Sequence, residues 1–298
     1  MAGLSARFPG QVQVSPLPAI VYTAFNTRAA PFNDPRVRRA FSLAADRGHF
    51  VSLLGGPDAA APTCQILPPG IPGYQPYCPF STDAGTSGTW VGPDLAAARR
   101  LVAASGTSGM RVTVRSDDYD PDPTTGAFTV AVLRELGYRA TLHIAPHAAV
   151  LQATNDSRRQ IQATDGIWFA DYPSASDFFD LFFRCSAFRL ADPAGTRNGA
   201  FFCDPAADRQ MNLADSQQTT DPAKAAATWA AIDRAVTYAA PWGDTGQPER
   251  GRLPVRPCQQ LPVQPVPWRA AGPVAHPPAT VLLTPANHPA MTVPASPI

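Results

Sequence analysis

AFNTRAAPFNDPRVRRAFSLAADR, residues 24–47, is the stretch of sequence that decides the fold. Asp34 followed by Pro35 is typical of a helix start, because aspartate caps free backbone N–H groups and proline fits the first turn. Val37, Phe41 and Ala44 then recur at helical spacing. Just upstream, residues 20–25 are apolar and β-branched or aromatic, and they predict a buried strand. A strand followed directly by an amphipathic helix indicates an α/β layer.

Similar signals alternate along the chain as far as residue 240. Capping residues, glycine stops and apolar periodicity define each expected element. The predicted helices are 48–54, 93–106, 128–136, 177–183 and two that open at Asp204-Pro205 and Asp221-Pro222; the predicted strands are 110–114, 138–144 and 165–170. We therefore predict an α/β domain over residues 20–242, preceded by an irregular segment, 1–19. Residues 57–91 look like a long surface excursion.

The C-terminal part has a different composition. Fourteen of the 34 prolines lie from Pro241 onward, and residues 251–298 contain no acidic residue and no apolar periodicity. Such a segment buries too little apolar surface to offset its ordering entropy, so residues 243–298 are predicted to be a disordered tail rich in proline and arginine. Lys224 is the only lysine, which indicates a GC-rich gene.

Overall charge and hydropathy exclude several classes. The 298 residues contain 24 Lys and Arg against 23 Asp and Glu, a net charge of +1, which gives no reason to expect a nucleic acid as partner. No apolar run reaches the roughly 18 residues of a membrane span. The first residues lack the apolar core of a secretory signal, so the chain as written is expected to stay in the cytoplasm.

Four cysteines bracket two loops, Cys64 with Cys78 and Cys185 with Cys203. The favoured interpretation is two local disulfides, each stabilising the fold by about 3 kcal/mol in an oxidising compartment. Four unrelated thiols or a metal site are the alternatives. The scattered histidines and the lack of a CxxC pair argue against a metal, and no cofactor is expected.

The acidic run 117–122 is the only sequence feature that suggests an enzyme. It resembles the start of a calcium loop or a pair of catalytic carboxylates, but it has two prolines and lacks the closing glutamate. A solvated turn is the favoured interpretation. His143 and His147 beside it are read as surface or core residues. No nucleophile or nucleotide-binding motif stands out, so no catalytic residue is predicted.

Asp171 is the carboxylate that stands out as a binding residue. It follows the apolar strand that ends in Trp168-Phe169-Ala170 and precedes Tyr172, at the end of a strand where open α/β sheets bind ligands. Such an acid, flanked by aromatic rings, can pair with a cation. A simple turn before Pro173 is the alternative.

Residues 24–47 resemble the signature of the extracellular solute-binding protein family 5, the oligopeptide-, dipeptide- and nickel-binding receptors of ABC transporters. Further matches follow in the same order at 93–106, 133–140, 168–173, 203–210 and 221–242. The resemblance covers about 220 residues and implies the second lobe of a type II, cluster C periplasmic-binding-protein fold, from an actinobacterial source. The first lobe and export signal of the family have no counterpart in this chain.

This resemblance implies a non-enzymatic, monomeric and extracytoplasmic binding component that closes on a peptide or similar small solute and presents it to a membrane permease. It implies that Asp171 holds the α-ammonium group of a peptide, with Trp168 and Tyr172 as neighbouring wall residues. With one lobe only, the chain by itself is expected to bind ligand weakly or not at all. A cytoplasmic ligand-sensing module, fused to or associated with a transcriptional regulator, is the alternative.

The chain departs from the family pattern after Pro241-Trp242, where family members continue into an apolar strand. One hypothesis is a frameshift near codon 243, since a shifted GC-rich frame often encodes proline and arginine. The other is a genuine proline-rich linker. The flanking genomic sequence distinguishes the two.

Overall fold

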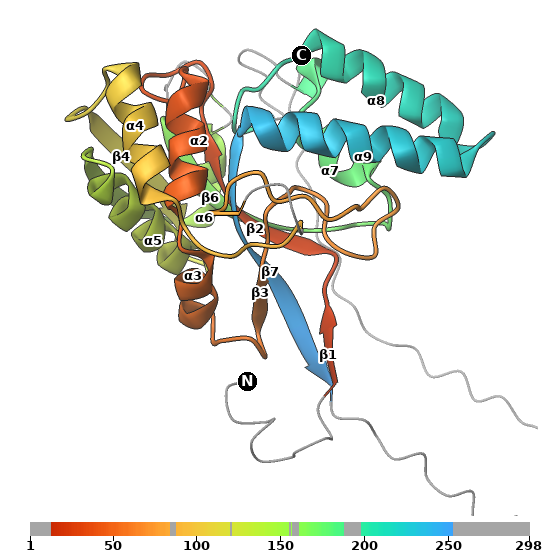
Figure 1. Cartoon of the computed structure of the whole chain (residues 1–298), viewed down its shortest axis with the longest axis horizontal. Coiled ribbons are helices and arrows are strands. Elements are labelled where there is room, and N and C mark those ends of the chain that lie inside the picture. Colours follow the sequence, from red (N-terminus) through yellow and green to blue (C-terminus); the bar gives the residue numbers. More distant parts are fainter. Residues whose placement is uncertain are drawn as a thin grey trace, which may run out of the picture. The chain divides into compact units, whose positions relative to one another are not determined.

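The computed structural model describes residues 13–83, 88–119, 121–154, 156, 161–187 and 198–252. Their strands form one sheet in the order β1-β7-β2-β6-β4-β5, with β3 paired to β7 (Figure 1). The strands are β1 (Gln13–Pro16), β2 (Ala19–Phe25), β3 (Ala60–Pro62), β4 (Arg111–Asp117), β5 (Arg139–Ala145), β6 (Ala163–Phe169) and β7 (Trp242–Arg252). β4 runs parallel to β5 and β6, and β2 runs antiparallel to β6 and β7. The predicted α/β class is confirmed.

Helices cover the sheet, and most of them begin where the sequence predicts. They are α2 (Pro35–Ala44), α3 (Arg47–Leu53), α4 (Leu95–Ser105), α5 (Asp122–Glu135), α6 (His147–Thr154), α7 (Ser176–Phe182), α8 (Pro205–Gln218) and α9 (Pro222–Ala239). The side chains of Asp34, Asp204 and Asp221 cap the first turns of α2, α8 and α9. Helix α5 begins six residues before its predicted start, and α6 was not predicted.

Strand β2 is buried on both faces, which explains its continuous apolar sequence. Val21 and Phe25 face a core formed with α2, α4 and α5. Ile20 and Ala24, on the other face, belong to a second core formed with α7, α8 and α9. Figure 1 shows the two helix groups on either side of β2 and β7.

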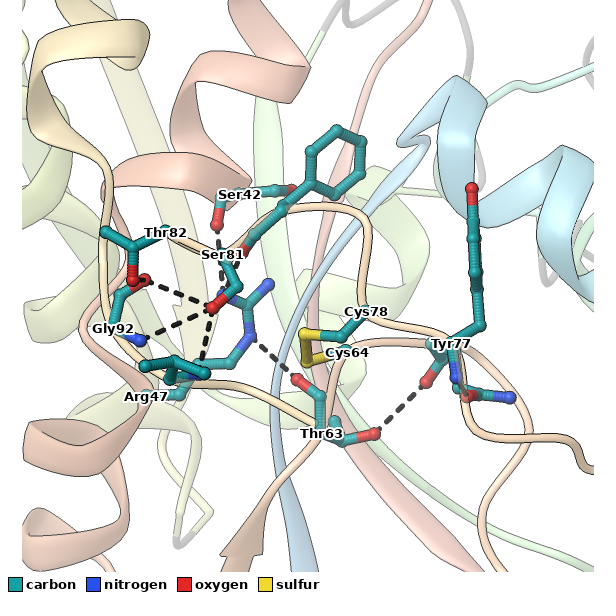
Figure 2. The surroundings of a disulfide bond; sticks show 12 residues. Ser42, Arg47, Thr63, Cys64, Tyr77, Cys78, Ser81, Thr82 and Gly92 are labelled. Carbon is teal, nitrogen blue, oxygen red and sulfur yellow. Dashed lines mark hydrogen bonds between the residues drawn. A yellow bond between two sulfur atoms is a disulfide. The ribbon is translucent and has the colours of Figure 1, made fainter. Parts of the chain in front are cut away.

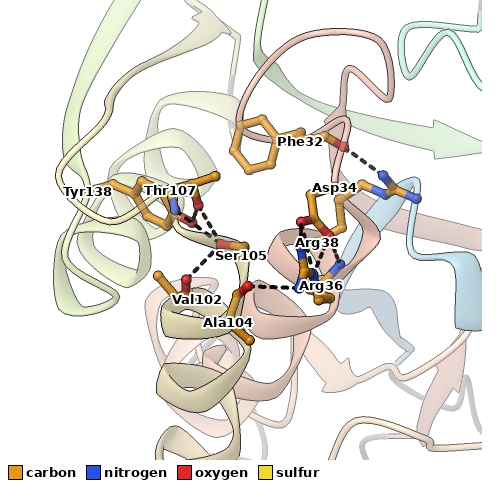
Figure 3. A network of polar contacts seen from close by, with 9 residues as sticks. All are labelled: Phe32, Asp34, Arg36, Arg38, Val102, Ala104, Ser105, Thr107 and Tyr138. Atoms are coloured by element: carbon orange, nitrogen blue, oxygen red, sulfur yellow. Dashed lines mark hydrogen bonds and ion pairs between the residues drawn. The ribbon is translucent and has the colours of Figure 1, made fainter.

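The opening of α2 ties this helix to α4. Arg36 pairs with Asp34, the N-cap residue, at 2.6 Å between Nη2 and Oδ2. Its Nη1 also donates to the carbonyl oxygen of Ala104 near the end of α4, at 2.8 Å (Figure 3). Beside this contact, the hydroxyl groups of Thr107 and Tyr138 lie 2.7 Å apart. Asp34 and Arg36 of the sequence signature therefore connect α2 to α4.

Arg38 is a buried arginine from the same signature. Its Nη1 donates to the carbonyl oxygen of Phe32 at 2.6 Å (Figure 3). Its Nη2 donates to the carbonyl oxygen of Ala239 at 2.8 Å. Burial, and then repulsion from Arg39, lower the pKa of Arg38 to about 10. The carbonyl of Ala239 is at the C-terminal end of α9, where a cation is favoured by the helix dipole. Arg38 thus connects α2 to a helix about 200 residues later.

The excursion that begins at residue 57 is held against the domain at several points. Arg47, 1% exposed, donates from Nε to the carbonyl oxygen of Thr63 at 2.7 Å and from Nη1 to that of Phe80 at 3.2 Å. A disulfide joins Cys64 to Cys78 next to these contacts (Figure 2).

Asp233 of α9 anchors the same loop from the other side. It accepts hydrogen bonds from Gln65 Nε2 at 2.6 Å and from the backbone N–H of Ile66 at 3.1 Å. Desolvation by burial raises the pKa of Asp233 to about 7.

Two boundaries predicted from sequence were wrong. Residues 243–252, predicted to belong to the disordered tail, continue β7, which pairs with β2, β3 and β1. Residues 13–16, predicted to be irregular, form β1, which pairs with residues 249–252 of β7. The predicted disorder of residues 253–298 lies outside the described residues. None of the helices in the described part of the chain is long and apolar enough to span a membrane.

Candidate ligand-binding site

The last residues of β6 and the segment that follows them, called here the Asp171 segment (residues 168–172), place Trp168, Asp171 and Tyr172 at the carboxyl end of this strand. Asp171 and Tyr172 are exposed, and Trp168 is partly buried. The side chain of Tyr172 is 51% exposed, and that of nearby Phe169 is 50% exposed. An exposed carboxylate with exposed aromatic residues near it in the sequence is suited to binding a cationic group.

Asp177, in the first turn of α7, holds this segment in place. Its carboxylate is buried, and its Oδ2 accepts hydrogen bonds from Trp168 Nε1 and from the backbone N–H of Asp171, both at 3.0 Å. The indole N–H is therefore used inside the protein. Sequence reasoning missed Asp177, although an acid in a first helical turn was a visible signal.

Aromatic packing supports the site from behind. Trp168 meets Phe182 of α7 edge-on, with ring centroids 5.0 Å apart. Phe182 in turn contacts Trp242 of β7 at 5.0 Å, and Trp242 stacks on Tyr22 at 3.6 Å. Such edge-on and stacked pairs stabilise an arrangement beyond the area they bury. The indole is thus held between the sheet and α7.

The acidic run 117–122 is only in part the solvated turn that the sequence predicts: Asp118 and Tyr119 are exposed, but the acids on either side of them are buried. Asp117 and Asp122 are each only 5% exposed, because β4 ends beneath the first turn of α5. The Oδ2 atom of Asp117 contacts Nδ1 of His147, which opens α6. Desolvation by burial raises the pKa of Asp122 to about 8, and repulsion from Asp117 and Asp165 adds to the effect.

Asp165 is a fully buried acid of β6 with a structural role. Its Oδ1 accepts from Thr23 Oγ1 at 2.5 Å and from Thr129 Oγ1 at 3.1 Å, and its Oδ2 accepts from Ser116 Oγ at 2.7 Å. These hydroxyl groups satisfy the carboxyl but do not offset its desolvation, which raises its pKa to about 6. The contacts join β2, β4, β6 and α5 to one another.

The second pair of predicted cysteines, Cys185 and Cys203, is joined in a disulfide between the end of α7 and the start of α8. The backbone N–H of Cys185 donates to Asp208 of α8 at 3.0 Å. Neither disulfide includes a residue of the Asp171 segment. Both disulfides close loops outside the Asp171 segment.

A cavity of about 320 Å³ lies elsewhere, between the excursion, β3 and β7. Gln65, Tyr74, Trp90 and Gln247 are among its lining residues. None of the three predicted ligand-binding residues, Trp168, Asp171 and Tyr172, lines it. The cavity and the Asp171 segment are therefore separate features.

Comparison with known proteins identifies a family and a fold. Residues 5–189 match the model described as "Bacterial extracellular solute-binding proteins, family 5 Middle". Two curated relatives come from Pseudomonas aeruginosa strain UCBPP-PA14. "Probable di/tripeptide-binding protein 5" is 25% identical over 69% of this chain and 36% of its own length, and "Di/tripeptide-binding protein 2" is 23% identical over 74% of this chain and 39% of its own.

Solved structures show the same architecture. The ABC transporter-associated periplasmic binding protein DppA from Helicobacter pylori, in complex with the peptide STSA, matches with a TM-score of 0.67 at 20% identity. The match covers 83% of this chain and 46% of that protein. The chain therefore spans less than half the length of these relatives.

Proposed function

Because this chain belongs to the bacterial extracellular solute-binding proteins of family 5, we propose that it forms part of the peptide-binding component of an ABC transporter. Two of its relatives are named for binding di- and tripeptides, and a third is described as associated with an ABC transporter. These relatives are binding proteins by name and not enzymes. The partners proposed for this chain are a peptide or similar small solute and a membrane permease.

Asp171 receives the α-ammonium group of the peptide, and Trp168 and Tyr172 form the walls beside it. The observation that carries this proposal is the exposed Asp171 segment at the end of β6, fixed from within by buried Asp177. A carboxylate on a fixed backbone segment loses less entropy on binding a cation than one on a mobile segment. A charge-assisted hydrogen bond of this kind contributes about 1.5–3 kcal/mol.

The chain supplies one wall of the binding site and acts by closure around the solute. The matched part is about two fifths of each curated relative, so a large share of the relatives' surface has no counterpart here. We expect this chain by itself to bind peptides weakly. Micromolar affinity of the isolated chain would contradict the one-wall part of the proposal.

An NMR titration of the ¹⁵N-labelled chain tests the ammonium contact, because it detects weak binding. Trialanine is compared with N-acetyl-trialanine, which lacks the cation. We expect shifts at the Asp171 segment with trialanine only, and an affinity at least about tenfold lower in Asp171→Asn. Glu135→Gln, at the C-terminal end of α5, removes one charge elsewhere and serves as the control. Equal binding of both peptides, or an unchanged affinity of Asp171→Asn, would contradict the proposal.

A further inference from the structure

A second acidic group lies on the same sheet edge as Asp171. Strand β4 runs parallel to β6, with Val114 opposite Ala163, so both strands end toward the same side. This register places Asp117 beside Gly166, three residues before β6 ends. At about 3.3 Å per residue along a strand and about 4.8 Å between strands, the two strand ends are roughly 11 Å apart. A ligand of two or three residues can span that distance.

The surface of this second group combines an open carboxylate with an open ring. Asp118 is exposed, and its Oδ1 accepts a hydrogen bond from the backbone N–H of His147 at 3.3 Å. Tyr119 is 69% exposed and packs edge-on against the imidazole of His147, with centroids 5.7 Å apart. The same combination of acid and aromatic ring occurs at Asp171 and Tyr172.

One oxygen of a buried carboxyl in the same acidic run lacks a hydrogen-bond donor, although this side chain is hydrogen-bonded to the neighbouring Asp117. Asp122 is 95% buried, and its Oδ1 has no hydrogen-bond donor among the described residues. Its strongest charged neighbours are two further acids, Asp117 and then Asp165. Arg115, which lies two residues before Asp117 on β4, makes no ion pair with a described acid. His147 is the one basic side chain of the described residues that contacts the group.

This arrangement favours an added cation. When buried carboxyl groups are close together and incompletely hydrogen-bonded, their ionised form is destabilised. A nearby positive charge offsets this destabilisation. The part of the chain described here contains no set of three or more side chains arranged to hold a metal ion. An exposed carboxylate beside a tyrosine ring instead suits an ammonium or guanidinium group.

We propose that Asp118 and Tyr119, in front of Asp117 and Asp122, bind a second cationic group of the solute whose ammonium group is held by Asp171. The preferred solute then carries two positive charges, such as a short peptide with a lysine or arginine side chain. This inference rests on the proposed function, because it assigns the substrate class of the same sheet edge.

The test compares trilysine with trialanine in NMR titrations of the same chain at pH 7.5. Both peptides carry an α-ammonium group, and only trilysine carries further cations. We expect trilysine to bind about tenfold more tightly, which corresponds to ~1.4 kcal/mol. Asp118→Asn, at an exposed position, is expected to abolish this difference and to leave trialanine binding unchanged. Glu135→Gln removes the same charge at the far end of α5 and is expected to preserve the difference.

The outcomes separate the inference from the function on which it rests. Equal affinity for the two peptides, or a preference for trilysine that survives Asp118→Asn, contradicts the second cationic subsite alone. A preference that Glu135→Gln reduces as much as Asp118→Asn does shows general charge attraction and also contradicts it. Failure of both peptides to shift resonances near Asp171 contradicts the proposed function, and the inference fails with it.

Discussion

Replacing Asp233 by alanine should release the excursion from α9. The carboxylate is 1% exposed and accepts four hydrogen bonds, from Gln65 Nε2, from the backbone N–H groups of Ile66 and Leu67, and from Thr237 Oγ1. Three of these donors belong to the loop that begins at residue 57. The contact thus joins residues 65–67 of this loop to α9, the longest helix of the described residues.

The cost follows from the donors that the alanine variant leaves buried. Gln65 Nε2 at 2.6 Å and the N–H of Ile66 at 3.1 Å make the two shortest bonds, and both residues are almost inaccessible to water. An unsatisfied buried donor costs about 1–3 kcal/mol, so the two together cost about 2–6 kcal/mol. Removing a desolvated carboxyl recovers part of this. We expect a net loss of about 3 kcal/mol in the free energy of unfolding at pH 6.

Urea unfolding followed by circular dichroism measures this loss. Arg234→Ala is the matched control, because Arg234 is the next residue of α9 and touches the same loop from outside, at Gln75 and Tyr77. An exposed contact of this type is expected to contribute less than about 1 kcal/mol. If Asp233→Ala cost no more than Arg234→Ala, the conclusion that Asp233 anchors the loop would be refuted.

Three other changes test the structure. Because burial raises the pKa of Asp122 to about 8, the folded state holds a proton that the unfolded state releases near pH 4. Stability should therefore fall as the pH rises between these values, by about 1.4 kcal/mol per pH unit at most, and Asp122→Asn should weaken this fall in urea unfolding at pH 5 and 8. Gly126→Ala should destabilise the domain by about 1–3 kcal/mol despite the better helix propensity of alanine, since its Cβ would lie 2.0 Å from Ser116 Oγ; a higher melting temperature would contradict this. Replacing Cys64 and Cys78 by serine should cost about 3 kcal/mol, and an unchanged urea midpoint under oxidising conditions would contradict that value.

Local signals in the sequence were sufficient for most helices. The aspartate-proline starts of α2, α8 and α9 depend on interactions within four residues, so they are visible without tertiary structure. Helix α5 shows the limit. Its first turn contains Asp122, Pro123, Thr124 and Thr125, which have low helix propensity, and packing over the end of β4 determines that these residues are helical.

The candidate site was only partly accessible from the sequence. The position of Asp171 after an apolar strand predicted an exposed acid, and the structure places it there. Asp177 fixes the backbone of Asp171 because the chain turns back between these two residues, which are six positions apart. Hydrophobic periodicity in the sequence does not predict such a turn. The burial of Asp117 and Asp122 depends on α5 and α6 covering the sheet edge, so an acidic run that looks solvated in sequence became a buried pair.

Strand β7 is the clearest case in which long-range contacts override local sequence. WGDTGQPERGR has neither apolar alternation nor β-branched enrichment, yet it pairs with β2 and then with β1 along its length, and with β3 at residues 246–248. Two of its glycines explain how it fits. A Cβ at Gly243 would lie 2.5 Å from the ring of Phe41, and one at Gly246 would lie 2.9 Å from that of Phe50.

The strand therefore approaches the first core closely because it lacks side chains at the two positions that these rings occupy. A peptide read from an arbitrary frame has no reason to place glycine at both positions. The fit favours a strand that belongs to the fold at least as far as Gly246. The close packing against Phe41 and Phe50 depends on Gly243 and Gly246. If the reading frame changes in this region of the gene, we therefore expect the change after Gly246 and not at residue 243.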